Sequence, residues 1–153
     1  MSGLDSLYQE LILDHSKQRV GFGLLPDAEG AGVATSHQHN PICGDDITLR
    51  VRVEGDAVRE ITWEGAGCAI SQASASMLAS LIAEDSGPDG LPRTEASALV
   101  DGFREALRSR GTKALDEETF SDAAALSGVS RYTARVKCAM LAWVAFEDAL
   151  ARA

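Results

Sequence analysis

The chain has 153 residues, a mass of 16.2 kDa and a formal net charge of −9. This length predicts a single domain, 1–153, because domains most often run to about 100–150 residues. The acidic balance argues against nucleic acid and against an anionic membrane surface as partners, since both need a basic footprint. No apolar run approaches the roughly 18 residues of a membrane span, and the opening residues lack signal-peptide form, so we expect a cytoplasmic protein.

Hydrophobic periodicity predicts a helix over residues 4–17, followed by three strands. The first strand lies within 33–40. The second, 47–54, alternates apolar and polar side chains at each step, as a half-buried strand does. A tight turn at 55–56 joins it to a third strand through 58–63, so the second and third strands form an antiparallel hairpin.

Helical spacing returns after the hairpin. Small and apolar residues predict a tightly packed helix over 68–82, and a turn-rich, exposed connector follows at 84–93. Further helices are expected over 94–111, briefly around 122–126, and over 131–152. Strands come together in the chain, and so do helices. The predicted class is therefore α+β, with a small three-stranded antiparallel sheet packed against helices.

The three cysteines lie in three different settings. Cys43 is in a turn before the main strand, Cys68 follows a Gly-Ala-Gly turn at a helix start, and Cys138 lies inside the last helix. An odd count in a reducing compartment does not predict a disulfide framework. Asp45 is two residues after Cys43, so both side chains point to one side of an extended segment. If the elements converge, three thiolates and a carboxylate would form a four-coordinate site for zinc or iron–sulfur chemistry.

Other readings of the same residues stay open. A free cysteine is often a small buried apolar residue, and for Cys138 on an alanine-lined helix this explanation is the stronger one taken alone. Cys68 lies at the positive end of a helix dipole, which favours a thiolate. His37 and His39 share one side of a strand and, with Cys43, are a rival His/His/Cys zinc arrangement, or else a solvated strand face.

Basic residues gather around the last cysteine. Arg131 and Arg135 are one helical turn apart, and Lys137 is adjacent to Cys138. They could offset the negative charge of a thiolate-rich site, or form a solvated helix end. A Cys/His pair could also serve a cysteine hydrolase, although no nucleophile-elbow motif supports that function.

Three separated motifs carry a resemblance to a known family. They are N-P-x-C-G-D-D at 40–46, G-x-G-C-A-I-S-x-A-S-x-S-M at 65–77, and A-R-x-K-C-A-x-L-A-W at 134–143. Together with the opening L-Y-x-E-L-I-L-D-H, they resemble the SufU branch of the IscU/NifU-like proteins of iron–sulfur cluster assembly. The resemblance covers nearly the whole chain.

This resemblance implies a SufE/NifU-like fold and a zinc site. The family's metal ligands fall on Cys43, Asp45, Cys68 and Cys138, and they would hold Zn²⁺. The resemblance further implies that Cys43 accepts sulfur from the persulfide of a SufS-type cysteine desulfurase and passes it to a downstream Suf assembly scaffold. Arg135 is a candidate to pair with Asp45 or with the released thiolate. Such a protein is a sulfur acceptor and desulfurase activator rather than a stand-alone enzyme.

Two alternatives are compatible with the same residues. The four ligands could assemble a [2Fe–2S] cluster, which would make the protein a scaffold. Lys137 counts against this assignment, because the IscU scaffold branch has a histidine immediately before the last cysteine. The site could also be a structural zinc module that serves as an interaction domain, without sulfur transfer.

Overall fold

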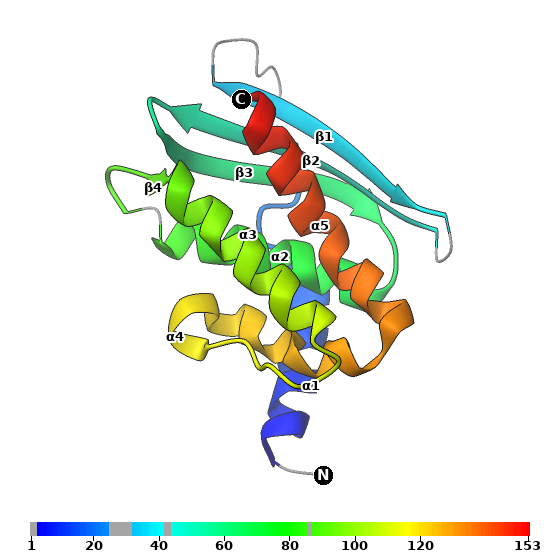
Figure 1. Ribbon diagram of the computed structural model, residues 1–153. Coiled ribbons are helices and arrows are strands. Elements are labelled where there is room, and N and C mark those ends of the chain that lie inside the picture. Colours follow the sequence, from blue (N-terminus) through cyan, green and yellow to red (C-terminus); the bar gives the residue numbers. More distant parts are fainter. Residues whose placement is uncertain (1–2, 25–31, 42–43, 86) are drawn as a thin grey trace.

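The computed structural model describes residues 3–24, 32–41, 44–85 and 87–153 (Figure 1). It has one antiparallel sheet with the strand order β1-β2-β3-β4, packed against helices. In chain order the elements are α1 (Gly3–Gln18), β1 (Val33–Asn40), β2 (Asp45–Glu54), β3 (Ala57–Ala66), α2 (Ala69–Asp85), β4 (Leu91–Pro92), α3 (Arg93–Arg108), α4 (Glu117–Phe120), the 3-10 helix η1 (Ser121–Arg131) and α5 (Thr133–Arg152).

Strand β2 lies inside the sheet, between β1 and β3, and its side chains alternate between buried and partly exposed. Leu49 and Val51 are fully buried and point toward the helices. Leu49 is paired with Trp63 of β3, which is also fully buried, so the apolar residues of the two strands share one face. The antiparallel hairpin predicted from the alternation is therefore confirmed, and its turn lies between β2 and β3.

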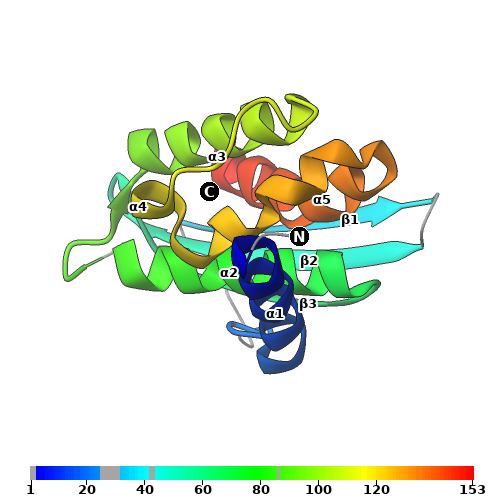
Figure 2. The ribbon, with the colours of Figure 1, turned by 90° about the horizontal axis from the view of Figure 1, so that it is seen from below.

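The helices cover the apolar face of the sheet. Helix α5 packs on β1 and β2, α2 packs on β3, and these two helices contact each other. All residues from 71 to 79 of α2 are buried, and most are Ala or Ser, so the helix can lie close to its neighbours. Figure 2 shows α3 as a further layer outside α5. Between these two helices the rings of Phe103 and Trp143 stack with centroids 3.9 Å apart.

The sheet has four strands, so the prediction of three was wrong in this detail. Strand β4 is two residues long, and it pairs with Ala57 and Val58 of β3. It lies in the connector that the sequence predicted to be an exposed loop. A two-residue strand has no alternation to detect, and Pro92 has no N–H for a strand ladder, so no pattern in the sequence predicts this pairing.

The segment before α5 also differs from the prediction. Instead of one short α-helix around 122–126, the chain forms α4 and then the 11-residue 3-10 helix η1. Residues three apart in η1, namely Ala123, Leu126 and Val129, are all buried. A 3-10 helix has 3.0 residues per turn, so this spacing places all three side chains on one face.

The longer helices are confirmed to within a few residues of their predicted ends. Helix α3 ends at Arg108, slightly before the predicted end, and α5 begins at Thr133. Within the described parts of the chain, none of these helices has both the length and the apolar character that crossing a membrane requires.

Candidate metal centre

Three donor side chains from three elements meet near one end of the sheet. Asp45 is the first residue of β2, Cys68 immediately precedes α2, and Cys138 lies near the beginning of α5. One ligand atom from each residue lies within 4.8 Å of the others. Around a tetrahedral ion with Zn–S bonds of about 2.3 Å, ligand atoms lie roughly 3.8 Å apart, so this donor set fits an ion after small side-chain movements.

The carboxylate of Asp45 is held by the beginning of α2. The backbone N–H of Cys68 donates to Asp45 Oδ1 at 2.8 Å, and Asp45 Oδ2 lies 3.7 Å from Cys68 Sγ. Asp45 is fully buried and Cys138 is almost fully buried, whereas Cys68 is partly exposed. Burying a carboxylate is costly unless it is paired, so the residue is placed for a specific partner. The site therefore opens to solvent on the side of Cys68.

Gly67 makes room for this arrangement. A Cβ atom at residue 67 would collide with Asp45 Oδ1 and would lie 2.6 Å from Ser71 Oγ. Ser71 Oγ in turn donates to the carbonyl of Cys68 at 3.0 Å and fixes the backbone at the start of α2. Neither Gly67 nor Ser71 was predicted from the sequence to have a role in the site. The Gly-Ala-Gly turn before Cys68 was the available signal for a close approach of backbone and side chain.

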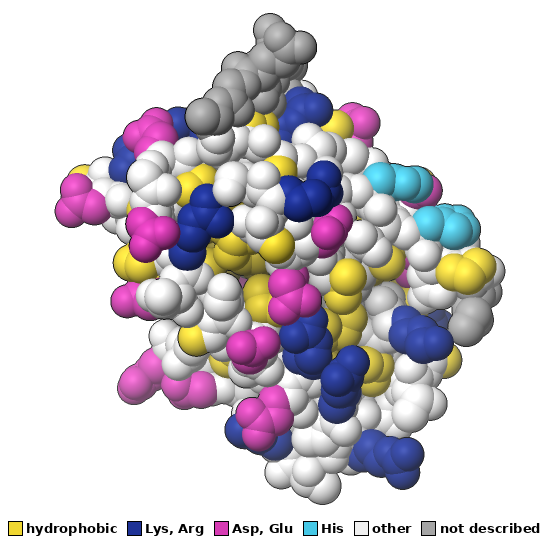
Figure 3. All heavy atoms as spheres, turned by 45° about the horizontal axis from the view of Figure 1, so that its top comes forward, with side chains coloured by type: hydrophobic (Ala, Val, Ile, Leu, Met, Phe, Trp, Pro, Cys, Tyr) yellow, Lys and Arg dark blue, Asp and Glu magenta, His cyan; other side chains and the backbone are white. Residues whose placement is uncertain are grey.

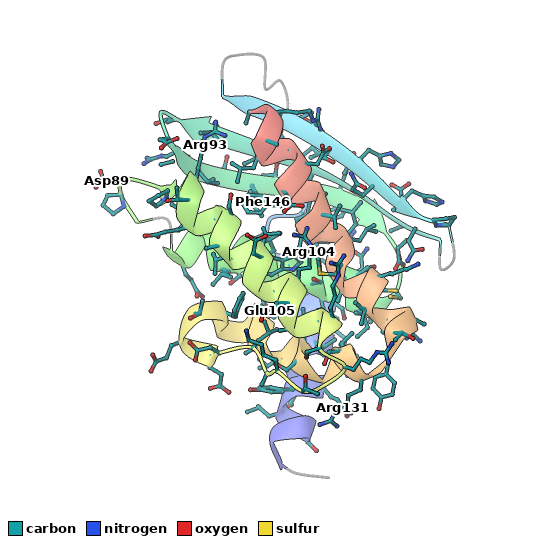
Figure 4. All side chains as sticks on the ribbon, viewed as in Figure 1. Asp89, Arg93, Arg104, Glu105, Arg131 and Phe146 are labelled. Atoms are coloured by element: carbon teal, nitrogen blue, oxygen red, sulfur yellow. The ribbon has the colours of Figure 1, made fainter. Side chains whose placement is uncertain are left out.

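A groove of about 600 Å³ opens beside Cys68. Its walls come from α1, α2, η1 and α5, and they combine apolar, aromatic and basic side chains, including Tyr8, Ile12, Ile70, Val129, Arg131, Tyr132 and Arg135. Figure 4 shows Arg131 on the side of the molecule where α1 lies. Within the described residues Arg135 forms no ion pair, so its guanidinium is available to an anionic group in the groove.

The structure brings together three of the four predicted ligands. Cys43 lies outside the residues that the structure describes, so its participation stays a prediction. The described residues on either side of it are close in space, because the N–H of Gly44 donates to the carbonyl of Asn40 at 2.8 Å. Gly44 has φ 74°, a left-handed conformation that favours glycine. The described chain thus turns back on itself between Asn40 and Gly44, immediately before Asp45.

The two exposed histidines, His37 and His39, lie away from the site formed by Asp45, Cys68 and Cys138, which we call the thiol site. His39 is paired with Asp46, and successive residues of a strand point to opposite faces. Asp45 points toward the helices, so Asp46, His37 and His39 lie on the other face of the sheet. In the described structure the histidines therefore do not join Cys68 and Cys138 in one site.

The chain matches a known protein family over most of its length. The family model described as "NifU-like N terminal domain" matches residues 7–139. The chain belongs to this family. Among its NifU-like relatives, the zinc-dependent sulfurtransferase SufU of Bacillus subtilis is 36% identical over 151 residues, which cover 99% of this chain and 94% of the relative. The iron–sulfur cluster assembly scaffold protein IscU of Streptococcus pyogenes is 36% identical over 152 residues, which cover 99% of this chain and 87% of the relative.

Solved structures of NifU-like proteins have the same fold. The SUF-system protein FiSufU of Fervidobacterium islandicum has a TM-score of 0.77 and 30% identity, with 97% of this chain and 99% of that chain covered. The N-terminal part of a NifU-like protein from Brucella abortus has a TM-score of 0.74 and 25% identity, with 99% and 96% covered. The predicted α+β class and the resemblance to the IscU/NifU-like proteins are both confirmed.

Proposed function

We propose that this protein accepts sulfur from a SufS-type cysteine desulfurase and passes it into iron–sulfur cluster assembly. The observation that carries the proposal is the grouping of Asp45, Cys68 and Cys138 in a chain whose relatives include a zinc-dependent sulfurtransferase. Cys43 is the fourth proposed ligand, since it is two residues before Asp45 in the sequence. Three thiolates and one carboxylate suit Zn²⁺, which has no redox chemistry and keeps thiols deprotonated.

The backbone settings of the three cysteines suggest different roles. Cys138 is buried within α5, and Cys68 is anchored at the start of α2 by its N–H bond to Asp45. The sequence predicts a turn at Cys43, and a Cβ at the adjacent Gly44 would meet no described atom within 4 Å. A turn can change its conformation at less cost than a helix can. We therefore assign sulfur acceptance to Cys43 and anchoring to Cys68 and Cys138.

The transfer step is a thiol–disulfide exchange in which electrons balance without an added oxidant. The Cys43 thiolate attacks the outer sulfur of the desulfurase persulfide and forms a new S–S bond. The S–S bond of the desulfurase breaks, and its cysteine leaves as a thiolate. The groove beside Cys68 provides the approach, and Arg135 on its wall supports the anionic persulfide.

A scaffold is the second candidate function. The Streptococcus pyogenes relative that is as similar as SufU is named an assembly scaffold. The same four ligands could hold a [2Fe–2S] cluster, since cysteine thiolates are the usual cluster ligands. Lys137, next to Cys138, favours the sulfur acceptor over the scaffold.

Metal analysis followed by mass spectrometry tests the proposal. Freshly purified protein should be colourless and contain about one zinc ion per chain, as one four-ligand site requires. After incubation with a SufS-type desulfurase and cysteine, the peptide that contains Cys43 should gain one sulfur atom. Cys43→Ala should lose this modification and the activation of the desulfurase while it keeps most of its folded structure.

Each alternative has its own outcome. Sulfur acceptance by the Cys43→Ala variant at the wild-type level would move the acceptor role to another cysteine. Brown protein with stoichiometric iron, purified without oxygen, would support the scaffold. Zinc without any persulfide on Cys43 would leave a structural zinc module.

A further inference from the structure

Two histidines and an aspartate lie together on the sheet face opposite the thiol site. His37 and His39 alternate along β1, so their side chains project from the same face. His39 is paired in register with Asp46 of β2. His37 and His39 are exposed, whereas His15 is buried, and Figure 3 shows histidine side chains in cyan at the surface.

Both imidazoles approach one carboxylate oxygen. Asp46 Oδ2 lies 2.8 Å from His37 Nε2 and 3.6 Å from His39 Nδ1. The side chains of His37, His39 and Asp46 are 58%, 50% and 43% exposed. Half-exposed side chains can adjust their χ angles without disturbing the core. Strand register thus gathers the three side chains around Asp46 Oδ2. Among the described residues only Asp45, Cys68 and Cys138 already have all their ligand atoms within 4.8 Å of one another, so the two imidazoles must turn toward each other to close around an ion.

We propose that His37, His39 and Asp46 form a second metal site, which takes a borderline divalent transition-metal ion such as Zn²⁺ or Fe²⁺. Two imidazoles and one carboxylate are suitable donors for these ions, and the remaining positions are left to water. Alternate residues of a strand have Cα atoms about 6.6 Å apart, since each residue rises roughly 3.3 Å. Two imidazole rings that lean toward each other span this distance with one ion between them.

This site is chemically distinct from the thiol site, although Asp45 and Asp46 are neighbours in the chain. Asp45 faces the thiols of Cys68 and Cys138, whereas Asp46 faces exposed imidazoles. Three nitrogen and oxygen donors in contact with solvent bind an ion more weakly than a closed thiolate site, so the ion exchanges readily. The inference does not depend on the proposed sulfur transfer.

A zinc titration tests the site. Zn²⁺ is added to the full chain, and binding is followed by calorimetry and by competition with a chromophoric chelator. At the same free zinc concentration, the wild-type protein should bind one more equivalent of Zn²⁺ than each of three variants, His37→Ala, His39→Ala and Asp46→Asn. In each variant the affinity of this second site for Zn²⁺ should fall at least tenfold. Asp101→Asn, which alters an exposed acid of α3, should titrate like the wild type.

Two further measurements separate a shared site from independent surface histidines. In ¹⁵N NMR, the imidazole signals of His37 and His39 should shift together, with the same dependence on zinc concentration. Cys68→Ser should keep this histidine-dependent equivalent. Separate titrations of the two histidines, or a His37→Ala variant in which His39 binds zinc with unchanged affinity, would overturn the proposal.

Discussion

At the residue scale, the thiol site depends on a position that has no side chain. Gly67 lies against both the Asp45 carboxylate and the Ser71 hydroxyl. Gly67→Ala should push the carboxylate away from Cys68, because Asp45 is fully buried and has little room to move. We expect weaker zinc binding and a loss of about 1–3 kcal/mol in the free energy of unfolding, as for other overpacked sites. Chelator competition and urea denaturation measure the two effects.

Gly128→Ala is the matched control for this prediction. Gly128 is exposed, and a Cβ there would meet no described atom within 4 Å. The control should keep the zinc affinity of the wild type. Equal zinc affinity in Gly67→Ala and Gly128→Ala would contradict the close packing described around Asp45.

The sequence predicted individual donors better than their proximity. Strand alternation singled out Asp45, and the Gly-Ala-Gly turn singled out Cys68, because both signals are local. For Cys138 taken alone, a core residue was the stronger explanation, and it is in fact buried. Its approach to Cys68 depends on how α5 packs against α2, which local patterns do not encode. That part of the site came from the resemblance, whose three motifs already linked the cysteines.

At the element scale, packing and charge contribute unequally to the contact between α3 and α5. Phe103 and Trp143 stack with an interplanar angle of 5°, and both are fully buried. Next to them, Arg104 binds Glu147 through two hydrogen bonds of 2.6 and 3.1 Å, and Figure 4 shows Arg104 on the side of α3 that faces α5. Phe103→Ala should cost about 3–5 kcal/mol of unfolding free energy, as removal of a buried ring does.

Arg104→Ala should cost much less, about 0.2–1 kcal/mol, because its partner carboxylate is exposed to solvent. Chemical denaturation of both variants, and a double-mutant cycle with Glu147→Ala, gives the two values. An arginine effect as large as the phenylalanine effect would contradict this ranking. Salt should weaken the Arg104 contribution and leave the Phe103 contribution nearly unchanged.

The first helix is attached to the rest of the molecule partly through a tyrosine. Tyr8 donates a hydrogen bond of 2.6 Å to Glu117 of α4, and this bond raises the pKa of Tyr8 to about 12, with burial as a smaller cause. The folded state therefore holds the phenol proton more tightly than the unfolded state does. The stabilisation is fully present below about pH 10, the ordinary tyrosine pKa, and is lost as the pH rises toward 12.

Unfolding experiments at alkaline pH test this predicted loss of stability. The free energy of unfolding of the wild type should fall above about pH 10, and Tyr8→Phe should remove that part of the decline. Tyr132→Phe, which alters an exposed tyrosine, should keep the wild-type profile. A wild-type profile in Tyr8→Phe would show that the bond to Glu117 contributes nothing measurable.

Elements with long, regular patterns were predictable, and short ones were not. The alternation in β2 and the helical spacing of α1, α3 and α5 extend over many residues, so local burial determines them. Strand β4 and helix η1 arise from tertiary contacts. Strand β4 forms where the chain passes the edge of β3, and η1 winds more tightly where it packs on α1, α2 and α5.

At the scale of the whole molecule, the proposed zinc ion would connect β2, α2 and α5, which are the elements that enclose the core. An ion that binds the folded state alone stabilises it by mass action, about 2.7 kcal/mol at 100 times the dissociation constant and about 1.4 kcal/mol more for each further tenfold increase. Chelation should therefore lower the unfolding temperature, and added free zinc should restore it along this slope. Thermal unfolding across a series of buffered zinc concentrations measures the slope.

The same zinc-dependent thermal unfolding, carried out on Cys68→Ser and His37→Ala, distinguishes the thiol site from the histidine site. Cys68→Ser should lose the slope, because it removes a donor that is held at the start of α2. His37→Ala should keep the slope at low free zinc, because the exposed histidine site binds zinc more weakly than the thiolate site and is not filled at low free zinc. If the unfolding temperature of the wild type does not respond to zinc, no ion bridges β2, α2 and α5. The grouping of Asp45, Cys68 and Cys138 would then be a consequence of core packing alone.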